Sequence, residues 1–273
     1  MNIVLVPDIT MEQAISQKIP SVFHKTSTII IPAYNEEKVI GKNLEEVGTY
    51  ISDNNLKWSV IVSVDGDDNT GKLVSSYSER FPFISIAKSN ERNGKGAAVK
   101  RVIDKLNSEY VILMDADGSL AFETIVKNLD LLEDSDCLIF SRYFSRNNIP
   151  FLRKFLSRGF NILVRALLDL EVRDTQSGYK VFKTKPFIRA MRMVGPTNTF
   201  WDVALLYYLY RDKLKIKEIS CEYDHRKESK FHPIGEIFGQ GISLIAFRIR
   251  HSRFYKYIPK SLVSLYYRKL RWI

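Results

Sequence analysis

The chain has 273 residues, of which 45% are hydrophobic and 26% are charged, so it can bury a core without disulfides or metals. This composition excludes a largely disordered protein. Lysine and arginine number 41 against 31 aspartates and glutamates, which leaves a net charge of +10. After Glu236 the chain has eight basic residues and no acidic one, which predicts a polyanionic partner such as a membrane or nucleic acid.

Short patterns exclude two further classes of protein. Cys137 and Cys221 are far apart and match no metal spacing, so we expect buried thiols in a reducing compartment, without a disulfide framework or zinc site. No apolar run reaches the roughly 18 residues of a membrane-spanning helix. The first residues lack the basic start and long apolar core of a signal peptide, so we expect neither feature here.

A regular alternation of apolar runs and amphipathic stretches begins at Thr28, after an N-terminal extension over residues 1–26. Apolar runs that end in turn or acidic residues predict strands, and the stretches between them have helical spacing. The expected strands are Thr28–Ile31, Trp58–Val64, Phe83–Ala87, Tyr110–Met114 and Cys137–Phe140. The expected helices are Glu36–Ile51, Thr70–Arg80, Gly94–Leu106 and Phe122–Leu132. The alternation predicts an α/β fold whose mostly parallel sheet is covered by helices on both faces.

The alternation fades after Asn147, and Phe151–Asp169 predicts one long basic amphipathic helix. The next expected elements are helices at Phe187–Met193 and Trp201–Arg211 and strands at Val181–Lys183 and Ile216–Tyr223. Beyond them, Ile237–Phe247 and Leu262–Leu270 are expected to form amphipathic helices on either side of Pro259. We therefore expect one folded domain over residues 27–232 and a basic, aromatic tail over residues 233–273.

Polar residues follow the first two expected strands, at the edge where parallel sheets bind ligands. In Pro32–Glu37, Asn35 can cap a helix opened by the two glutamates, and the Tyr34 ring can stack on a ligand base. In Asp65–Thr70, three carboxylates within four residues repel one another unless a cation or hydrogen-bond donors compensate. The second stretch is therefore either a capped turn or a set of acceptors for a nucleobase or ribose.

Two more stretches predict a phosphate and metal site. Asn93–Ala98 opens a helix with glycines that let the backbone approach a phosphate, and Lys95 adds a mobile positive charge. A buried strand ends in Asp115 and Asp117, whose carboxylates share one side because they are two residues apart in an extended chain. Such a pair is costly without a cation, and its hard oxygens suit Mg²⁺ or Mn²⁺. Together the four stretches predict a pocket for a nucleoside diphosphate and a metal.

These stretches resemble the successive motifs of family 2 inverting glycosyltransferases with the GT-A fold, in which the last is the metal-binding DxD motif. The motifs that follow are similar in order to those of the dolichyl-phosphate glucosyl- and mannosyltransferases. They are Ser141–Tyr143, Arg153–Asn161, Arg173–Lys180, Phe200–Asp202 and His225–Lys230. The resemblance covers residues 27–231 and implies a Rossmann-like GT-A catalytic domain over residues 27–232, followed by C-terminal amphipathic helices.

The resemblance also implies roles for individual residues of the donor pocket. Those implied to hold the nucleotide are Pro32, Ala33, Tyr34, Glu36, Asp65, Lys95, Asp115 and Ala116. The implied ligands of Mg²⁺ or Mn²⁺ are Asp115 and Asp117. The implied catalytic residues are Asp117, Asp174 and Lys95, with Asp202 as another acidic candidate. The chain departs from the family at Asp65, which stands alone before its glycine, and at Ser119, where family members commonly have glutamine.

The same resemblance implies an acceptor site for a phosphate. Its contacts are expected from Arg142, Arg153, Ser157 and Arg226. A polyprenyl phosphate is already largely dianionic at pH 7, so it needs cations to position it more than it needs a base. The tail after Phe231 mixes aromatic and basic residues, which suits a helix lying in a bilayer interface.

The resulting hypothesis is a metal-dependent, inverting transfer of a hexose from a nucleotide sugar to dolichyl or polyprenyl phosphate. We expect a peripheral or monotopic protein at the cytoplasmic face of a membrane. UDP-glucose is the favoured donor, because Asp174–Lys180 looks more like the glucosyl branch, and GDP-mannose is next. Two alternatives stay open: a transferase with a polysaccharide or glycan acceptor and, more distantly, a basic nucleic-acid-binding protein. No nucleic-acid motif supports the last one.

Overall fold

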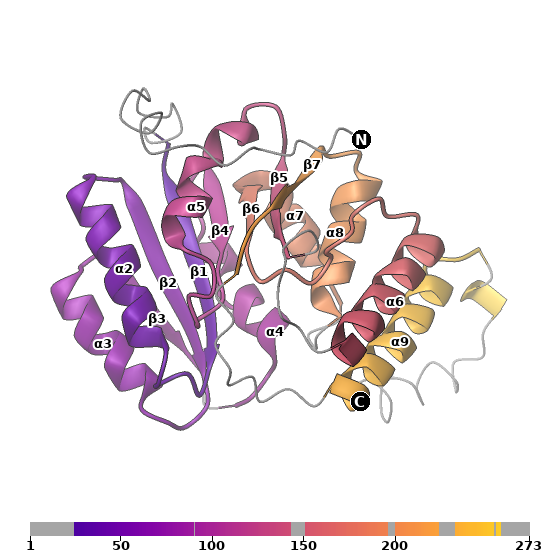
Figure 1. The fold of residues 1–273 in the computed structure, drawn as a ribbon, viewed down its shortest axis with the longest axis horizontal. Helices are drawn as coiled ribbons and strands as arrows, with labels where there is room; N and C mark the ends of the chain where they lie inside the picture. The colour runs from indigo at the N-terminus through magenta and orange to yellow at the C-terminus, as the bar shows by residue number, and fades with distance from the viewer. Residues whose placement is uncertain are drawn as a thin grey trace.

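The computed structural model describes residues 25–89, 91–142, 151–195, 200–223, 233–253 and 255–257. These residues form a seven-stranded sheet in the order β3-β2-β1-β4-β6-β5-β7 (Figure 1). Its strands are β1 (Ser27–Tyr34), β2 (Trp58–Asp65), β3 (Ile84–Lys88), β4 (Tyr110–Leu113), β5 (Cys137–Ser141), β6 (Lys180–Lys183) and β7 (Ile216–Ser220). The α-helices are α2 (Ile40–Asp53), α3 (Thr70–Arg80), α4 (Lys95–Lys100), α5 (Phe122–Lys127), α6 (Phe151–Leu168), α7 (Thr184–Met193), α8 (Trp201–Arg211) and α9 (Pro233–Arg250). Short 3₁₀ helices are η2 (Ile103–Lys105), η3 (Leu129–Leu132) and η4 (Tyr255–Tyr257).

The sheet is mostly parallel, as the sequence predicts. Strands β1, β2, β3 and β4 pair in parallel, as do β5 and β7, whereas β6 lies antiparallel between β4 and β5. The carboxyl ends of β1, β2 and β4 therefore meet at one edge. Because β6 runs the other way, the segment that leads into it arrives at that same edge, and residues 174–180 come to lie beside the end of β4.

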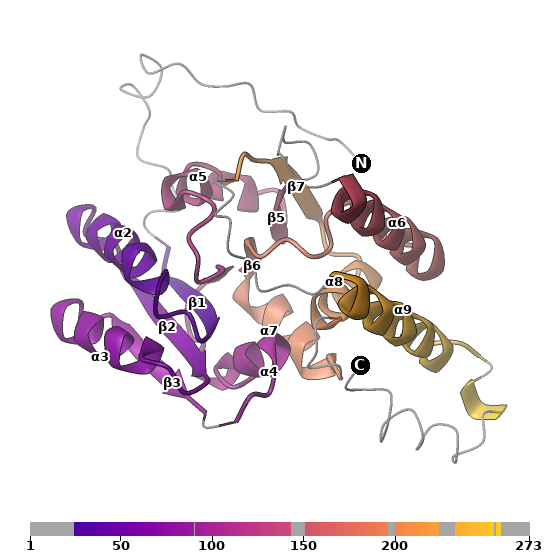
Figure 2. The ribbon, with the colours of Figure 1, turned by 60° about the horizontal axis from the view of Figure 1, so that its bottom comes forward.

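Each strand contributes side chains to two cores, one on each face of the sheet. In β1, Ile29 and Ile31 lie in the core covered by α2, α3 and α5, whereas Ile30 lies in the core covered by α4, α6, α7, α8 and α9. This alternation follows from the two-residue period of an extended chain. Helices lie on both faces, as expected, and Figure 2 shows α6 and α9 side by side at the end of the molecule opposite α2 and α3.

Several predicted boundaries are wrong around β1. The strand continues through Pro32 to Tyr34. The backbone nitrogen of Pro32 is directed to the same side as that of Ile30, towards β4, and the pairing with β4 has already ended at Ile30, so no N–H is required there. A proline without an N–H is tolerated there. The next helix begins at Ile40 instead of Glu36, and Asn35 does not cap it: its φ of 53° places it in a left-handed turn.

Elsewhere the predicted helices lie close to the observed ones. Thr70–Arg80 and Trp201–Arg211 have the predicted bounds. The two predicted helices Gly94–Leu106 and Phe122–Leu132 are each interrupted, so that a one- to two-turn α-helix is followed by a 3₁₀ segment. The predicted helix over 237–247 lies within α9, whose buried Leu244 and Phe247 pack into the core beside α6 and α8. The expected helix over 262–270 and the extension over 1–24 lie outside the described residues.

Cys137 and Cys221 are both buried and unpaired, as the sequence predicts. Burial raises the pKa of each thiol, that of Cys221 to about 12, so both are protonated and unreactive at neutral pH. Within the part of the chain that the structure describes, no helix is long and apolar enough to cross a membrane.

Candidate active site

Two loops at the carboxyl edge are joined through the side chains of Asn35 and Glu37. The Asn35 Oδ1 accepts hydrogen bonds from the N–H groups of Asp67 (3.2 Å) and Asp68 (3.5 Å). The Glu37 Oε2 accepts from the Asn69 N–H at 3.0 Å, and the Glu36 N–H donates to the Thr70 hydroxyl at 2.8 Å. Asn35 and Glu37 therefore hold the backbone of the acidic turn after β2, and the Asn35 amide also donates to the Asp67 Oδ1 at 3.4 Å. The Asp68 Oδ1 accepts the Thr70 N–H at the start of α3 at 2.9 Å, as in a capped turn, and binding of a nucleobase or ribose here stays a prediction.

Asp65 is buried at the end of β2 and has two partners. Its Oδ1 forms an ion pair with Arg101 at 2.7 Å, and its Oδ2 accepts the Asn93 N–H at 3.2 Å. The same guanidinium donates to the Ser63 hydroxyl at 3.0 Å. These contacts fix the loop that precedes α4 against the sheet. The sequence did not identify Arg101, because it looks like an ordinary basic residue on the surface of a helix. A contact between Asp65 and a nucleobase stays a prediction.

The other residues predicted to hold a nucleotide differ in exposure. The Ala33 side chain is buried in the core, whereas Tyr34 at the last position of β1 is 41% exposed. The guanidinium of Arg92 lies 4.4 Å from the centre of the Tyr34 ring. A ring held at the sheet edge with one cation on it can stack on a planar base. Arg92 had no signal in the sequence beyond its place next to the Asn93–Ala98 stretch.

The turn that carries Asp115 and Asp117 is held by neutral groups from distant elements. Asn43 on α2 is buried and donates its amide to the carbonyls of Asp115 (3.1 Å) and Ala116 (3.4 Å). The buried Tyr179 hydroxyl donates to the Asp117 Oδ1 at 3.1 Å. The Ser119 N–H donates to the same oxygen at 3.0 Å. The sequence did not identify Asn43 as a site residue, because a lone asparagine on a helix has no distinctive pattern.

Asp115 faces both a cation and a glycine. The Lys95 ammonium donates to its Oδ1. A Cβ at Gly178 would overlap the carboxylate of Asp115, so only glycine permits this close approach. Burial favours the neutral form of Asp115, but the positive charges of Lys95, Arg142 and Lys180 outweigh it and lower the pKa of this carboxyl. Asp115 is therefore ionised at neutral pH.

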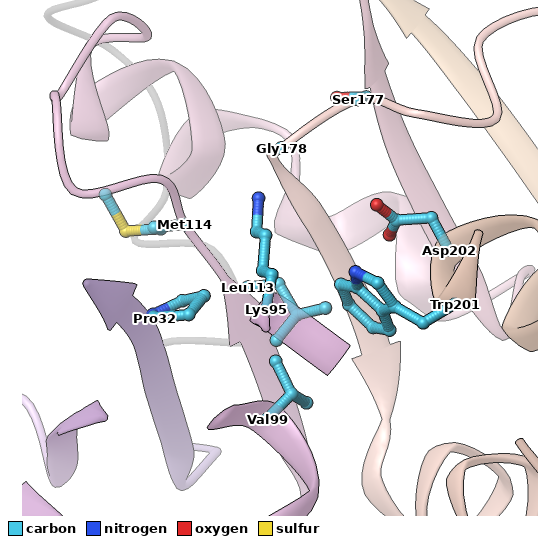
Figure 3. A pocket seen from close by; sticks show the side chains of 9 residues that line it. All are labelled: Pro32, Lys95, Val99, Leu113, Met114, Ser177, Gly178, Trp201 and Asp202. Carbon is cyan, nitrogen blue, oxygen red and sulfur yellow. The ribbon is translucent and has the colours of Figure 1, made fainter. Parts of the chain in front are cut away.

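A buried ion pair lies beside the contact of Lys95 with Asp115. Lys180, the first residue of β6, is 1% exposed and donates to Asp202 at 2.9 Å. Figure 3 shows Lys95 and the carboxylate of Asp202 directed into one narrow space, next to Trp201 and Gly178. Asp202 helps to raise the pKa of Lys95 despite the opposing effect of burial. The structure thus brings Asp202, the alternative acidic candidate, to the predicted site and gives it Lys180 as a partner.

Arg142 and Asp174 form the part of the site predicted for an acceptor. The Asp174 Oδ2 accepts from the Arg142 N–H (3.0 Å) and from its Nε (3.4 Å). Burial disfavours the charge of Arg142, but Asp174 reverses this effect and raises the pKa of the guanidinium. Arg142 also interacts electrostatically with Asp115. The Arg142 guanidinium donates to the Gln176 carbonyl at 3.2 Å, and Gly178 of the same segment lies against Asp115, so one loop links the arginine predicted for the acceptor to the aspartate predicted for the metal.

The loop that holds Asp174 is fixed by Glu218 on β7. Its carboxylate accepts the N–H groups of Arg173 (2.9 Å) and Asp174 (2.8 Å). Burial raises the pKa of Glu218. No pattern in the sequence points to this residue, since it lies 44 residues away in a strand. The side chains of the remaining predicted acceptor contacts, Arg153, Ser157 and Arg226, lie outside the described residues.

The chemistry of the aspartate pair fits a divalent metal. Asp115 is ionised, Asp117 lies two residues away on the same turn, and both supply hard oxygens. Among the described residues, no three His, Cys, Asp or Glu side chains are grouped so that they could hold a metal ion. Two carboxylates would leave the other coordination positions to phosphate oxygens and water, which is the usual arrangement for Mg²⁺.

Residues 28–190 match the family model described as "Glycosyl transferase family 2". A dolichyl-phosphate beta-glucosyltransferase of Trichomonas vaginalis is 32% identical over 77% of this chain and 69% of its own length. A dolichyl-phosphate beta-glucosyltransferase of Dictyostelium discoideum is 28% identical over 82% of this chain and 74% of its own. A glucosyl-3-phosphoglycerate synthase of Mycobacterium tuberculosis, solved with Mn²⁺, UDP-glucose and phosphoglyceric acid, has a similar fold. Its TM-score is 0.63 at 17% identity, over 90% of this chain and 85% of that one. The chain is a glycosyltransferase with the GT-A fold and belongs to glycosyl transferase family 2.

Proposed function

We propose that this enzyme transfers glucose from UDP-glucose to dolichyl phosphate or a related polyprenyl phosphate, with inversion at the anomeric carbon. The names of the relatives support the acceptor and the sugar. The observation that carries the proposal is a chain of contacts between the two sides: Arg142, assigned to the acceptor phosphate, donates to the Gln176 carbonyl at 3.2 Å, and Gly178, two residues further on, lies against the carboxylate of Asp115, assigned to the donor. An anionic nucleophile and a diphosphate leaving group would both find cations in this site.

On the donor side, Pro32, Tyr34, Glu36 and the backbone of Ala33 would line the nucleoside position, and Asp65 would belong to the same pocket. Mg²⁺ or Mn²⁺ held by Asp115 and Asp117 would stabilise the negative charge that develops on the leaving diphosphate. Lys95 would add a second positive charge there. The similar fold of the Mycobacterium tuberculosis synthase, which was solved with Mn²⁺ and UDP-glucose, is compatible with these assignments.

On the acceptor side, Arg142 would bind the lipid phosphate together with Arg153, Ser157 and Arg226. The phosphate monoester is largely dianionic at pH 7, so its oxygen can attack without losing a proton to a base. Asp174 would act through Arg142, because its carboxylate already holds that guanidinium. Arginine suits this role, since its planar fork matches phosphate oxygens.

An exposed apolar surface beside basic residues supports a lipid acceptor. The structure describes seven exposed large hydrophobic side chains, and five of them lie on α6 and α9: Ile162, Leu163, Leu167, Ile245 and Ile249. The two helices pack side by side (Figures 1 and 2). The sequence of α6 contains four basic residues and no acidic one. Apolar side chains among basic ones suit an anionic bilayer surface.

We propose that this surface, continued by the basic and aromatic tail, rests on the cytoplasmic face of a membrane. The inner face of α9 would anchor the tail segment, residues 233–273, to the catalytic domain over residues 27–232, since Leu244 and Phe247 are buried in the core. The enzyme would then present Arg142 to phosphates at the level of the lipid headgroups.

A transfer assay in detergent tests the proposed function. Purified protein is incubated with Mg²⁺ or Mn²⁺, radiolabelled UDP-glucose or GDP-mannose, and dolichyl phosphate, dolichol or an oligosaccharide. We expect label from UDP-glucose in dolichyl phosphate, none in dolichol, and a β-linked product. Label from GDP-mannose alone would overturn the donor assignment. Transfer to the oligosaccharide without transfer to dolichyl phosphate would favour the glycan-acceptor alternative.

A further inference from the structure

Lys95 lies where a metal ion would meet Asp115. Its ammonium contacts the Oδ1 of Asp115, and the carboxylate lies so close to Gly178 that a Cβ there would overlap both oxygens, Oδ2 most closely. The Oδ1 of this aspartate is therefore paired with the lysine. A divalent cation that binds Asp115 through Oδ1 has to displace the ammonium.

The charges around this contact show what a metal that binds alone would leave unpaired. The cluster contains three cations, Lys95, Lys180 and Arg142, and four carboxylates, Asp115, Asp117, Asp174 and Asp202. A bare divalent ion would change its formal charge from −1 to +1 and would leave the lysine without Asp115. A nucleoside diphosphate that binds with the metal brings negative charges, and these offer the lysine a new partner.

Lys95 can make such a move. It is the first residue of α4 and follows Gly94, and its side chain is 36% exposed. The flexible four-carbon stem of lysine allows its ammonium to sweep over several ångströms without backbone movement. The contact with Asp115 thus resembles an exchangeable counter-ion more than a fixed structural bridge.

We propose that Lys95 occupies the cation position at Asp115 in the donor-free enzyme and moves to the diphosphate when donor and metal bind together. This inference rests on the proposed donor and metal, but not on the acceptor. It predicts that metal and donor bind cooperatively. The metal frees the Lys95 ammonium from Asp115, and the donor diphosphate gives that ammonium a new partner. Free metal ions would then occupy the site poorly until the donor arrives.

The test is a Mn²⁺ titration followed by electron paramagnetic resonance, which reports bound metal without any turnover. It is run with and without UDP on the wild type and on Lys95→Met. The matched control is Lys100→Met, because this lysine lies on the same helix and donates to the Val194 carbonyl instead of a carboxylate. Thermal unfolding verifies that each variant is folded.

We expect weak Mn²⁺ binding by the wild type without UDP, and a large increase in affinity with UDP. Lys95→Met should bind Mn²⁺ roughly 10-fold or more tightly without UDP, because one charged hydrogen bond no longer competes. UDP should then increase the affinity by a correspondingly smaller factor. Lys100→Met should behave like the wild type, and Lys95→Arg should restore weak binding without UDP.

Other outcomes overturn the inference. Unchanged or weaker nucleotide-free binding in Lys95→Met would show that the lysine does not compete with the metal, as would an equal gain in Lys100→Met. If Lys95→Met is unfolded, Lys95→Gln takes its place with the same expected result. Absence of Mn²⁺ binding in all variants, with and without UDP, would overturn both the inference and the proposed metal dependence. Failure to transfer glucose to dolichyl phosphate would leave these titrations unaffected.

Discussion

The two halves of the site are built from different interactions. On the donor side, neutral groups hold the turns: Asn35 holds the turn after β2, and Asn43 and Tyr179 hold the turn after β4. The ion pair of Asp65 with Arg101 is the exception, and it fixes the end of β2 instead of a turn. On the acceptor side, ion pairs take this role: Arg142 is bound to Asp174, and at the start of β6, which follows the Asp174 loop, the buried Lys180 is bound to Asp202. Asp115 lies between the halves, with Lys95 as its cation.

This difference predicts which substitutions reduce activity alone and which also reduce stability. Asp117 accepts hydrogen bonds from the neutral groups of Tyr179 and Ser119. Asp115 is paired with Lys95, but this lysine side chain is 36% exposed, so removal of the carboxylate leaves a charge that water can solvate. The acceptor-side pairs are different, because removal of one partner leaves a desolvated charge behind. Substitutions in the donor half should therefore reduce activity more than stability, and substitutions at Lys180 or Asp202 should reduce both.

The largest expected effect is on activity and comes from the aspartate pair. Asp115→Asn or Asp117→Asn should lower transfer by about 1,000-fold or more, because stabilisation of the leaving group by a metal is worth several kcal/mol. The midpoint of urea unfolding should stay close to that of the wild type. Chelation by EDTA should abolish wild-type activity, and Mn²⁺ or Mg²⁺ should restore it. Full activity in EDTA would refute the metal assignment.

The largest expected loss of stability comes from the buried pair on the acceptor side. Lys180→Met should lower the free energy of unfolding by about 3–5 kcal/mol, since it leaves Asp202 buried without its partner. The double variant Lys180→Met with Asp202→Leu should recover most of this loss. Urea denaturation measures both. If the single variant is as stable as the wild type, the two halves do not differ as described.

A change at Gly178 should affect the position of Asp115, the residue that lies between the two halves of the site. Gly178→Ala places a methyl group where the Asp115 carboxylate lies, so the carboxylate has to move. We expect at least about a 10-fold loss in the affinity for Mn²⁺ with UDP, because metal ligands tolerate little displacement. Gly159→Ala on α6 is the control, since a Cβ there meets no atom within 4 Å. Equal metal affinity in the two variants would contradict the close contact.

The smallest expected effect concerns the membrane surface. Ile162→Ser combined with Ile249→Ser should weaken binding to anionic vesicles by roughly 10-fold, because each exposed side chain buries apolar area worth about 1.5–3 kcal/mol at most. UDP affinity should not change. Added salt should weaken binding of the wild type without abolishing it, since salt screens charge but not apolar burial. Undiminished vesicle binding by the double variant would place the contact elsewhere, on the tail.

Local patterns were sufficient to predict much of the fold and which residues meet at the carboxyl edge of the sheet. The strands were visible as apolar runs, and Asp115 and Asp117 as a pair that ends one of them. The direction of β6 was not predictable, because four residues that begin with a buried lysine do not specify their neighbours. Asn35 was misassigned, since a helix cap and a support for a distant turn require the same side chain.

The residues that support the site were the hardest to predict. Asn43, Arg101 and Glu218 reach their partners across 72, 36 and 44 residues. In the sequence, each resembles a polar residue on the surface of a helix or strand. Only the packed fold shows that they hold the DxD turn, the end of β2 and the loop of Asp174.

The central claim is that Arg142 serves the acceptor phosphate while the donor is bound separately. Steady-state kinetics of Arg142→Ala, with dolichyl phosphate varied at saturating UDP-glucose, tests this claim together with a titration of UDP and Mn²⁺. We predict that the KM for dolichyl phosphate rises or kcat/KM falls by roughly 10- to 100-fold, the value of one or more charged hydrogen bonds, and that UDP affinity changes less than about threefold. A loss of UDP affinity with an unchanged KM for dolichyl phosphate would contradict the account, because it would place Arg142 in the donor half.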